Sequence, residues 1–154
     1  MRSKTFLLAA SAILIGTSLV AQPVAEGGRK FDQTMDGRQE VSGTPPNVTF
    51  AVGDPDGTGT ALITANHGQG RICWEITVNN IVTPTRGHIH EAPAGTNGPI
   101  RVTFFETGQP VNLEDCTTVD RARIKDIIQN PQNYYVNIHN SAFPAGAIRG
   151  QMSK

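Results

Sequence analysis

Three of the four histidines in this sequence have a spacing that could bring their imidazoles together. His88 and His90 lie two positions apart, so in a β-strand both point to one face while Ile89 points to the other. His139 ends an alternating run over residues 134–139, on the face opposite to the apolar side chains of that run. Neutral imidazoles are typical ligands of copper and zinc. If the two strands are neighbours, the pattern predicts a metal site formed by His88, His90 and His139.

Two side chains close to these histidines could orient them. Glu91 directly follows His90, and Asn137 lies on the same strand face as His139. Hydrogen bonds from such neighbours commonly hold metal-binding imidazoles in place. A plainer interpretation stays open as well, because His-x-His is a short pattern and histidines in strands often only hydrogen-bond a loop. The fourth histidine, His67, lies in a glycine-flanked turn and is expected to be an exposed bystander.

The sequence offers little support for nucleophilic or acid–base catalysis. Ser141 is near His139 only along the chain, and no nucleophile elbow or Cys–His pattern accompanies either residue. We expect Glu106, Glu114 and Asp115 to be solvated loop charges rather than a paired general acid and base. The three histidines therefore remain the candidates for chemistry.

The elements that must position these residues are short β-strands. Runs rich in Thr, Val, Ile and aromatic residues alternate with turns rich in Gly and Pro, such as those at 43–46, 53–57 and 94–99. The clearest hairpin joins residues 58–65 to residues 71–78, and its second arm alternates between apolar and polar side chains. This pattern predicts an all-β fold, either a β-sandwich or a barrel.

One segment has helical rather than strand spacing. Thr117-Thr118 could cap a helix whose isoleucines share one face, and Asn130-Pro131 would end it. We therefore expect one short helix over about residues 118–129, inserted in a long connection between two strands.

The N-terminus has the composition of a secretory signal peptide. Two basic residues precede an uncharged apolar stretch over residues 6–19, and small residues at Ala21 and Ala25 offer cleavage sites. The stretch is short for a spanning helix, and no second apolar stretch follows it. We therefore expect a signal peptide over residues 1–25, a flexible lead-in over 26–35, and a secreted or periplasmic protein with no membrane span in its mature form.

The charge and the cysteine content of the sequence limit the classes of binding partner and the cellular compartment that can be expected. Without Arg2 and Lys4 the mature chain keeps 11 of the 13 basic residues beside 13 acidic ones, and the basic residues are scattered. Such a chain does not attract nucleic acid. Cys73 and Cys116 both lie in the exported part, where an even pair is most simply a disulfide. Closing a loop of this length contributes roughly 4 kcal/mol in the chain-entropy model.

Three segments, taken in order, resemble the CHRD domain, which is repeated in chordin and found alone in many exported bacterial proteins. They are GHIHEAPAGTNGPI at 87–100, YVNIH at 135–139 and PAGAIRGQ at 144–151. The resemblance covers about residues 36–153, nearly the whole mature chain. It implies an immunoglobulin-like or Greek-key β fold. It also implies an extracellular binding role, with an unknown protein or glycan ligand as partner.

The resemblance also assigns individual residues. The motif histidines of the family correspond to His88, His90 and His139, and its arginine corresponds to Arg149. The usual acidic residue before Ile148 is replaced here by Ala147, which removes a contact that a glutamate would make. The HIH stretch with its glycine-rich loop is similar to the His-x-His of copper–zinc superoxide dismutases as well. That similarity stops there, because no equivalent of their bridging histidine is present.

Three hypotheses for function follow. The first is a non-enzymatic exported binding module with a mononuclear copper or zinc site on the three histidines. The second is a mononuclear copper redox enzyme of the superoxide-dismutase type, which needs an open coordination position. The third is a purely structural domain, in which the histidines only anchor loops and no ligand binds.

Overall fold

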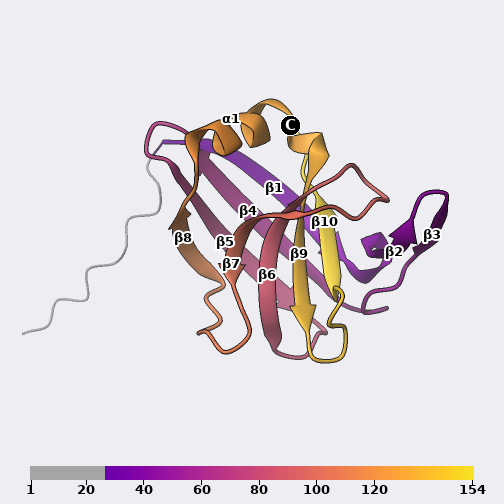
Figure 1. Cartoon of the computed structure of the whole chain (residues 1–154). Helices are drawn as coiled ribbons and strands as arrows, with labels where there is room; N and C mark the ends of the chain where they lie inside the picture. The colour runs from indigo at the N-terminus through magenta and orange to yellow at the C-terminus, as the bar shows by residue number, and fades with distance from the viewer. Residues whose placement is uncertain (1–26) are drawn as a thin grey trace, which may run out of the picture.

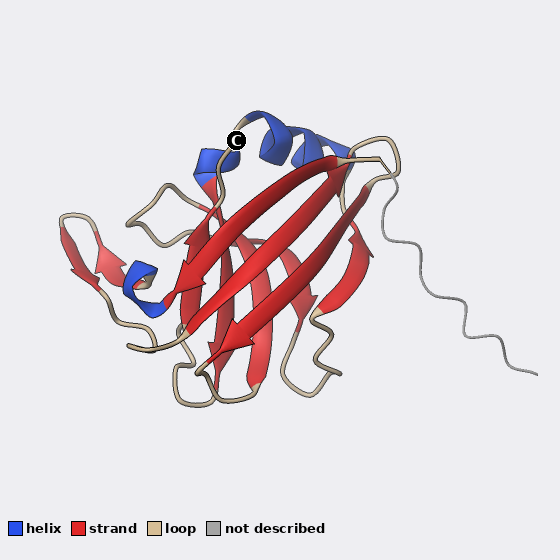
Figure 2. Ribbon diagram, turned by 180° about the vertical axis from the view of Figure 1, so that it is seen from behind, coloured by secondary structure: helices blue, strands red, loops and turns tan. Residues whose placement is uncertain are grey.

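Eight strands form one antiparallel sheet that curves into a nearly closed barrel, with the order β7-β6-β9-β10-β1-β4-β5-β8 (Figures 1 and 2). The computed structural model describes residues 27–154, so the expected signal peptide over 1–25 lies outside the described residues. The strands are β1 (Arg29–Asp36), β2 (Val41–Thr44), β3 (Asn47–Phe50), β4 (Thr58–Asn66), β5 (Arg71–Asn79), β6 (Pro84–Glu91), β7 (Ile100–Phe105), β8 (Glu114–Thr118), β9 (Tyr134–Asn140) and β10 (Ile148–Gln151). The prediction of an all-β fold is confirmed.

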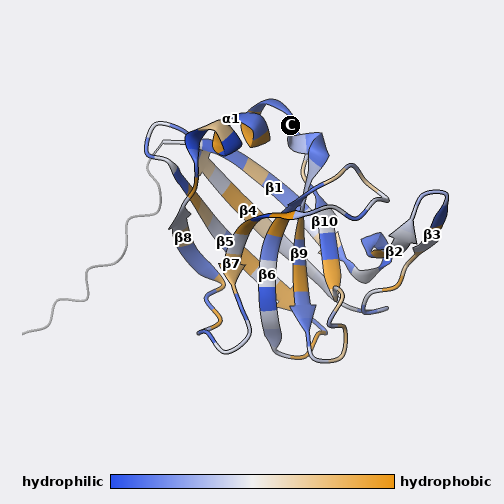
Figure 3. Cartoon of the chain, in the orientation of Figure 1, coloured by the Kyte–Doolittle hydropathy of each residue, from blue (hydrophilic) through white to orange (hydrophobic). Residues whose placement is uncertain are grey.

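The barrel forms because its strands alternate between an apolar inner face and a more polar outer face, a pattern visible as colour changes along the strands in Figure 3. The predicted hairpin of residues 58–65 and 71–78 is confirmed as β4 and β5, which pair from Thr58↔Asn79 to Asn66↔Arg71. The largest buried apolar side chains inside the barrel include Phe31, Met35, Ile63, Ile72, Trp74, Ile89, Ile138 and Ile148.

One helix, α1 (Arg121–Gln129), covers an end of the barrel (Figure 1). It buries Ile124 and Ile127, as the helical spacing of the isoleucines predicts. The helix begins at Arg121, slightly later than the expected start at about residue 118, and the expected cap at Thr117-Thr118 is wrong, since both residues belong to β8. The side chain of Asp120 caps the helix by accepting a hydrogen bond from the Arg123 backbone N–H at 3.2 Å. Two short 3-10 turns, η1 (Gly37–Gln39) and η2 (Pro131–Asn133), complete the elements of the described chain.

The expectation of a flexible lead-in over residues 26–35 is wrong for residues 29–35, which lie in β1 at the centre of the sheet. β1 pairs with β4 along its whole length and with β10 at Asp36↔Arg149. Phe31 and Met35 point inward and are almost fully buried. The charged residues Lys30, Asp32 and Asp36 lie on the opposite, outer face, so the segment looked polar although it alternates with a period of two.

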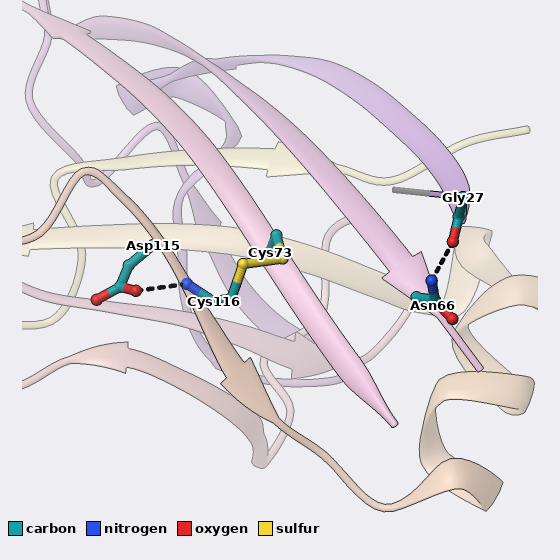
Figure 4. Close-up of a disulfide and its surroundings, with 5 residues drawn as sticks. All are labelled: Gly27, Asn66, Cys73, Asp115 and Cys116. Carbon is teal, nitrogen blue, oxygen red and sulfur yellow. Dashed lines mark hydrogen bonds between the residues drawn. A yellow bond between two sulfur atoms is a disulfide. The ribbon is translucent and has the colours of Figure 1, made fainter. Parts of the chain in front are cut away.

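The predicted disulfide is confirmed between β5 and β8 (Figure 4). Cys73 and Cys116 lie directly opposite each other in the strand register. β8 is an edge strand that pairs only with β5 among the described residues, so the bond ties the edge of the sheet to its neighbour. Within residues 27–154, no helix has the length and apolarity needed to cross a membrane.

Candidate metal centre

β6 and β9 are neighbours, and their register places the three predicted histidines on one outer face of the barrel. His88 lies opposite Asn137, and Arg86 lies opposite His139. Ile89 points into the core between the two histidines of β6. One ring nitrogen from each of His88, His90 and His139 can be chosen so that all three lie within 4.8 Å of one another. The parity argument therefore brings the imidazoles together once the strands are adjacent.

Irregular pairing between β6 and β7 surrounds the same stretch. Gly87 pairs with Phe105 but His88 pairs with Thr103, so β7 carries one extra residue there, and a second shift separates Ile89 from His90. Such bulges are frequent beside functional sites because they re-aim side chains. Here the first bulge lies at Phe104, near the end of β7, and Glu106 directly follows the strand.

The outward-facing nitrogen of each imidazole has a hydrogen-bond acceptor. His88 Nε2 lies 2.8 Å from a carboxylate oxygen of Glu106. His90 Nδ1 lies 2.9 Å from the carbonyl oxygen of Gly98, and His139 Nδ1 lies 3.1 Å from that of Pro144. A carbonyl or an ionised carboxylate can only accept, so each of these nitrogens carries the proton.

The inward-facing nitrogens are consequently left as lone pairs in the neutral rings. His88 Nδ1 and His139 Nε2 face each other at 3.2 Å. His90 Nε2 is buried and has no hydrogen-bond partner among the described residues. Two lone pairs at this distance repel each other, and an unpartnered buried nitrogen is costly. A cation placed among the three nitrogens would satisfy all of them.

The surroundings keep the imidazoles neutral. Only 1 % of His88 and 6 % of His139 is exposed to solvent. Burial lowers the pKa of His139 to about 4, with the positive charges of neighbouring groups acting in the same direction. Burial also lowers the pKa of His88 and of His90. The hydrogen bond to His88 lowers the pKa of Glu106, so that carboxylate is ionised at neutral pH. Neutral histidine is the form that binds metal.

The spacing suits a first-row transition metal after a small adjustment. Metal–nitrogen bonds of about 2.0–2.1 Å in a tetrahedral site separate neighbouring nitrogens by about 3.4 Å. The His88–His139 pair already has a separation of 3.2 Å. All three ring nitrogens lie within 4.8 Å of one another. A side-chain rotation that moves the third nitrogen by roughly an ångström would therefore bring it to bonding distance. Three protein ligands would leave a fourth position for water or another ligand.

The other residues expected near the histidines have different neighbours. Glu91 forms ion pairs with Arg101 at 2.6 Å and with Arg123 at 2.8 Å. Asn137 donates its side-chain N–H to Glu40. Among the described residues, neither side chain is hydrogen-bonded to an imidazole. Parity placed Asn137 on the correct face, but its side-chain amide is hydrogen-bonded to Glu40, which is distant in the sequence, and not to a histidine.

Arg149 is linked to His90 through a stack of rings, and its positive charge also lowers the pKa of that histidine. Its guanidinium carbon lies 3.4 Å from the centre of the Tyr135 ring. The Tyr135 ring also stacks on the His90 ring, with the ring centres 4.9 Å apart and the planes nearly parallel. The tyrosine hydroxyl accepts a hydrogen bond from the Gly98 N–H at 3.3 Å. The stack therefore fixes the plane of the His90 ring.

Three residues that orient the imidazoles are not evident as such in the sequence. Glu106 was expected to be a solvated loop charge, yet it binds His88 while its side chain stays 45 % exposed. Gly98 and Pro144 act through backbone carbonyls, which every residue possesses. No sequence pattern distinguishes them, because their role depends on how the loops at 92–99 and 141–147 fold over the strands.

Comparison with known proteins gives one family match. The family model of the CHRD domain matches residues 31–152. This range contains the three histidines, both cysteines, α1 and almost the entire sheet. No curated protein and no solved structure matches the chain.

Proposed function

This chain belongs to the CHRD domain family, and we propose that it is an exported binding module that holds one copper or zinc ion on His88, His90 and His139. The ligand atoms are Nδ1 of His88 and Nε2 of the other two. The observation that carries the proposal is the convergence of three buried nitrogen lone pairs. Each ring has its proton on the other nitrogen, where a hydrogen-bond acceptor holds it. Metal-binding histidines commonly have such a partner on the second ring nitrogen.

A purely structural role accounts for only half of this arrangement. Loop anchoring uses the outward nitrogens, which hold Gly98 and Pro144. It leaves the contact between His88 Nδ1 and His139 Nε2 without a proton to bridge it. A bound cation removes this conflict and needs no change in the outer hydrogen bonds. The metal proposal is therefore favoured over loop anchoring alone.

The donor set favours copper and zinc over hard cations. All three donors are imidazole nitrogens, which suit zinc, copper, iron and nickel, whereas calcium and magnesium prefer oxygen. Of the divalent first-row ions, copper binds nitrogen sites most tightly. A disulfide is typical of oxidising compartments, which supports secretion or export to the periplasm.

Metal content tests the proposal directly. The protein would be exported with its signal peptide, purified without a histidine tag and without refolding, stripped with chelator, and titrated with Cu²⁺ or Zn²⁺ by calorimetry. We expect one equivalent of metal. At a free metal concentration of about 100 times Kd, binding contributes about 2.7 kcal/mol and raises Tm by roughly 10 °C.

The variants separate this site from adventitious binding. His139→Ala and the double variant His88→Ala, His90→Ala should fold and lose the metal. His67→Ala is the matched control, because His67 is an exposed histidine in the turn between β4 and β5. If the double variant still binds one equivalent, the site is elsewhere and the proposal fails.

An enzymatic role is the second candidate, and the ligand count is the observation that favours it. Three protein ligands with a free fourth position are common in catalytic sites, whereas structural zinc sites usually have four. The test is the decay of superoxide catalysed by the copper-loaded protein. Catalysis that is lost in His139→Ala and kept in His67→Ala would support the enzyme. Stoichiometric copper without turnover would leave the binding module.

A further inference from the structure

We propose that a second pocket, distinct from the histidines, binds the carboxylate of an acidic sugar, a uronate. The pocket has a volume of about 120 Å³. It lies between η1, β3, β10 and the loop that follows β6. Its walls are formed by Arg38, Gln39, Phe50, Gly95, Arg149 and Gln151.

A buried positive charge forms part of the pocket. Arg149 is 1 % exposed and is the largest fully buried side chain in the described part of the protein. Its hydrogen bonds are long and go to uncharged oxygens, at 3.3 Å to Pro93 and Gln151 and at 3.5 Å to Asn97. None of the ion pairs in the described chain includes it. A buried charge without a counter-ion is costly.

The nearest acid compensates this charge only in part. Glu40 interacts electrostatically with Arg149, but no ion pair joins them within 4 Å. The carboxyl group of Glu40 accepts the side-chain N–H of Asn137 instead. Burial raises the pKa of Glu40 to about 7, so near neutral pH it carries only part of a negative charge. The guanidinium is therefore left largely without an anion.

A second arginine lines the same pocket, and no acidic residue does. Arg38 is exposed, and its guanidinium has no hydrogen-bond or ion-pair partner among the described residues. Two cations around a cavity without a carboxylate attract an anion. The planar guanidinium presents paired N–H groups that match the two oxygens of a carboxylate. A carboxylate in the pocket would supply the missing counter-charge.

An exposed aromatic ring beside the pocket indicates what the carboxylate is attached to. Phe50 is 63 % exposed, the highest value among the large apolar side chains described. The tip of the loop after β6 lies against it, since a Cβ built on Gly95 would be 3.2 Å from the ring. The pocket has room for a carboxylate group and few further atoms, so the body of the ligand must lie over the rim. A pyranose ring has an apolar C–H face that can rest on Phe50 and a hydroxyl edge that stays in water.

Nuclear magnetic resonance tests this inference independently of the metal site. The ¹⁵N-labelled mature protein, kept free of metal with chelator, would be titrated with D-glucuronate and, as the neutral control, with D-glucose. We expect saturable shifts of the amides of Gly95 and Phe50 with glucuronate and none with glucose. The histidine double variant should show the same glucuronate shifts, so this result does not depend on the proposed function.

Variants and competing anions decide the outcome. Arg38→Gln should weaken glucuronate binding about fivefold, because an exposed charge contributes about 1 kcal/mol. Lys30→Gln changes the net charge equally at the other end of β1 and should have no effect. Phe50→Ala should weaken glucuronate binding but not the binding of acetate. The inference would be overturned if the unmodified protein bound inorganic phosphate or acetate as tightly as glucuronate. It would also be overturned if glucuronate caused no saturable shift.

Discussion

His88 Nδ1 and His139 Nε2 lie 3.2 Å apart on adjacent strands, with their protons on the opposite sides of the two rings. Strand pairing alone does not explain this contact, because two unprotonated nitrogens at this distance repel each other. The outer acceptors Glu106 and Pro144 hold both rings in this orientation. This one contact links the strand register to the proposed metal chemistry, and most of the predictions about the site depend on it.

Glu106 should control the metal affinity without being a ligand. In Glu106→Gln the side chain keeps its size but loses the charge that fixes the proton on His88 Nε2. We expect the affinity for Zn²⁺, measured by calorimetry, to fall about 10–100-fold, as is typical for the loss of such a partner. Glu114→Gln is the control, since Glu114 is an exposed acid on β8. Equal affinities of the two variants would contradict the role given to Glu106.

Glu40 should make the stability of the protein fall as the pH rises from about 4.5 to about 7. Its pKa is raised from 4.5 to about 7 in the folded state, mainly by burial. Within this window the folded protein keeps the proton while the unfolded chain releases it, so raising the pH favours unfolding. Below the window the stabilising contribution is fully present, and above it the contribution is lost. The difference amounts to about 3 kcal/mol.

The variant Glu40→Gln isolates this contribution from that of the histidines. Glutamine can still accept the N–H of Asn137 but does not titrate. Urea unfolding at pH 5 and pH 8 should show that the wild type loses more stability than the variant between these values. Parallel loss of stability in both proteins would mean that Glu40 is ionised in the folded state throughout.

The disulfide should be a main contributor to stability. In the double variant Cys73→Ser, Cys116→Ser the chain loses a link between residues 43 positions apart. The chain-entropy model gives a loss of about 4 kcal/mol. Because β8 is held at the edge of the sheet by β5 alone, hydrogen exchange in β8 should increase first. Identical urea midpoints of the wild type with and without reductant would contradict this prediction.

The start of α1 can be tested with two neighbouring substitutions. Asp120→Ala removes the side chain that caps the Arg123 N–H and should cost about 1 kcal/mol. Thr118→Ala changes an exposed residue of β8 and should cost much less. The reverse order in thermal unfolding would place the cap where the sequence alone suggested it, at Thr117-Thr118.

Local patterns in the sequence were sufficient for several features. A period of two identified the hairpin of β4 and β5, and helical spacing identified the buried face of α1. The same parity placed His88, His90, Asn137 and His139 on one side of their strands. These predictions hold because side-chain direction within an element depends only on the backbone of that element. The pairing of the two cysteines needed no geometry, since only one pairing within the chain is available.

Only the tertiary structure decided which elements meet. The adjacency of β6 and β9 depends on the order of strands around the barrel, which no local pattern encodes. The same is true of β1, whose charged outer face concealed its central position, and of Glu106, which directly follows β7 and contacts His88 on the neighbouring strand. Arg149 and Phe50 are more than 90 positions apart, and their shared pocket forms where η1, β3 and the loop after β6 meet β10. Long-range packing determines such contacts because it selects, among many arrangements with equally good local structure, the one that buries the apolar faces together.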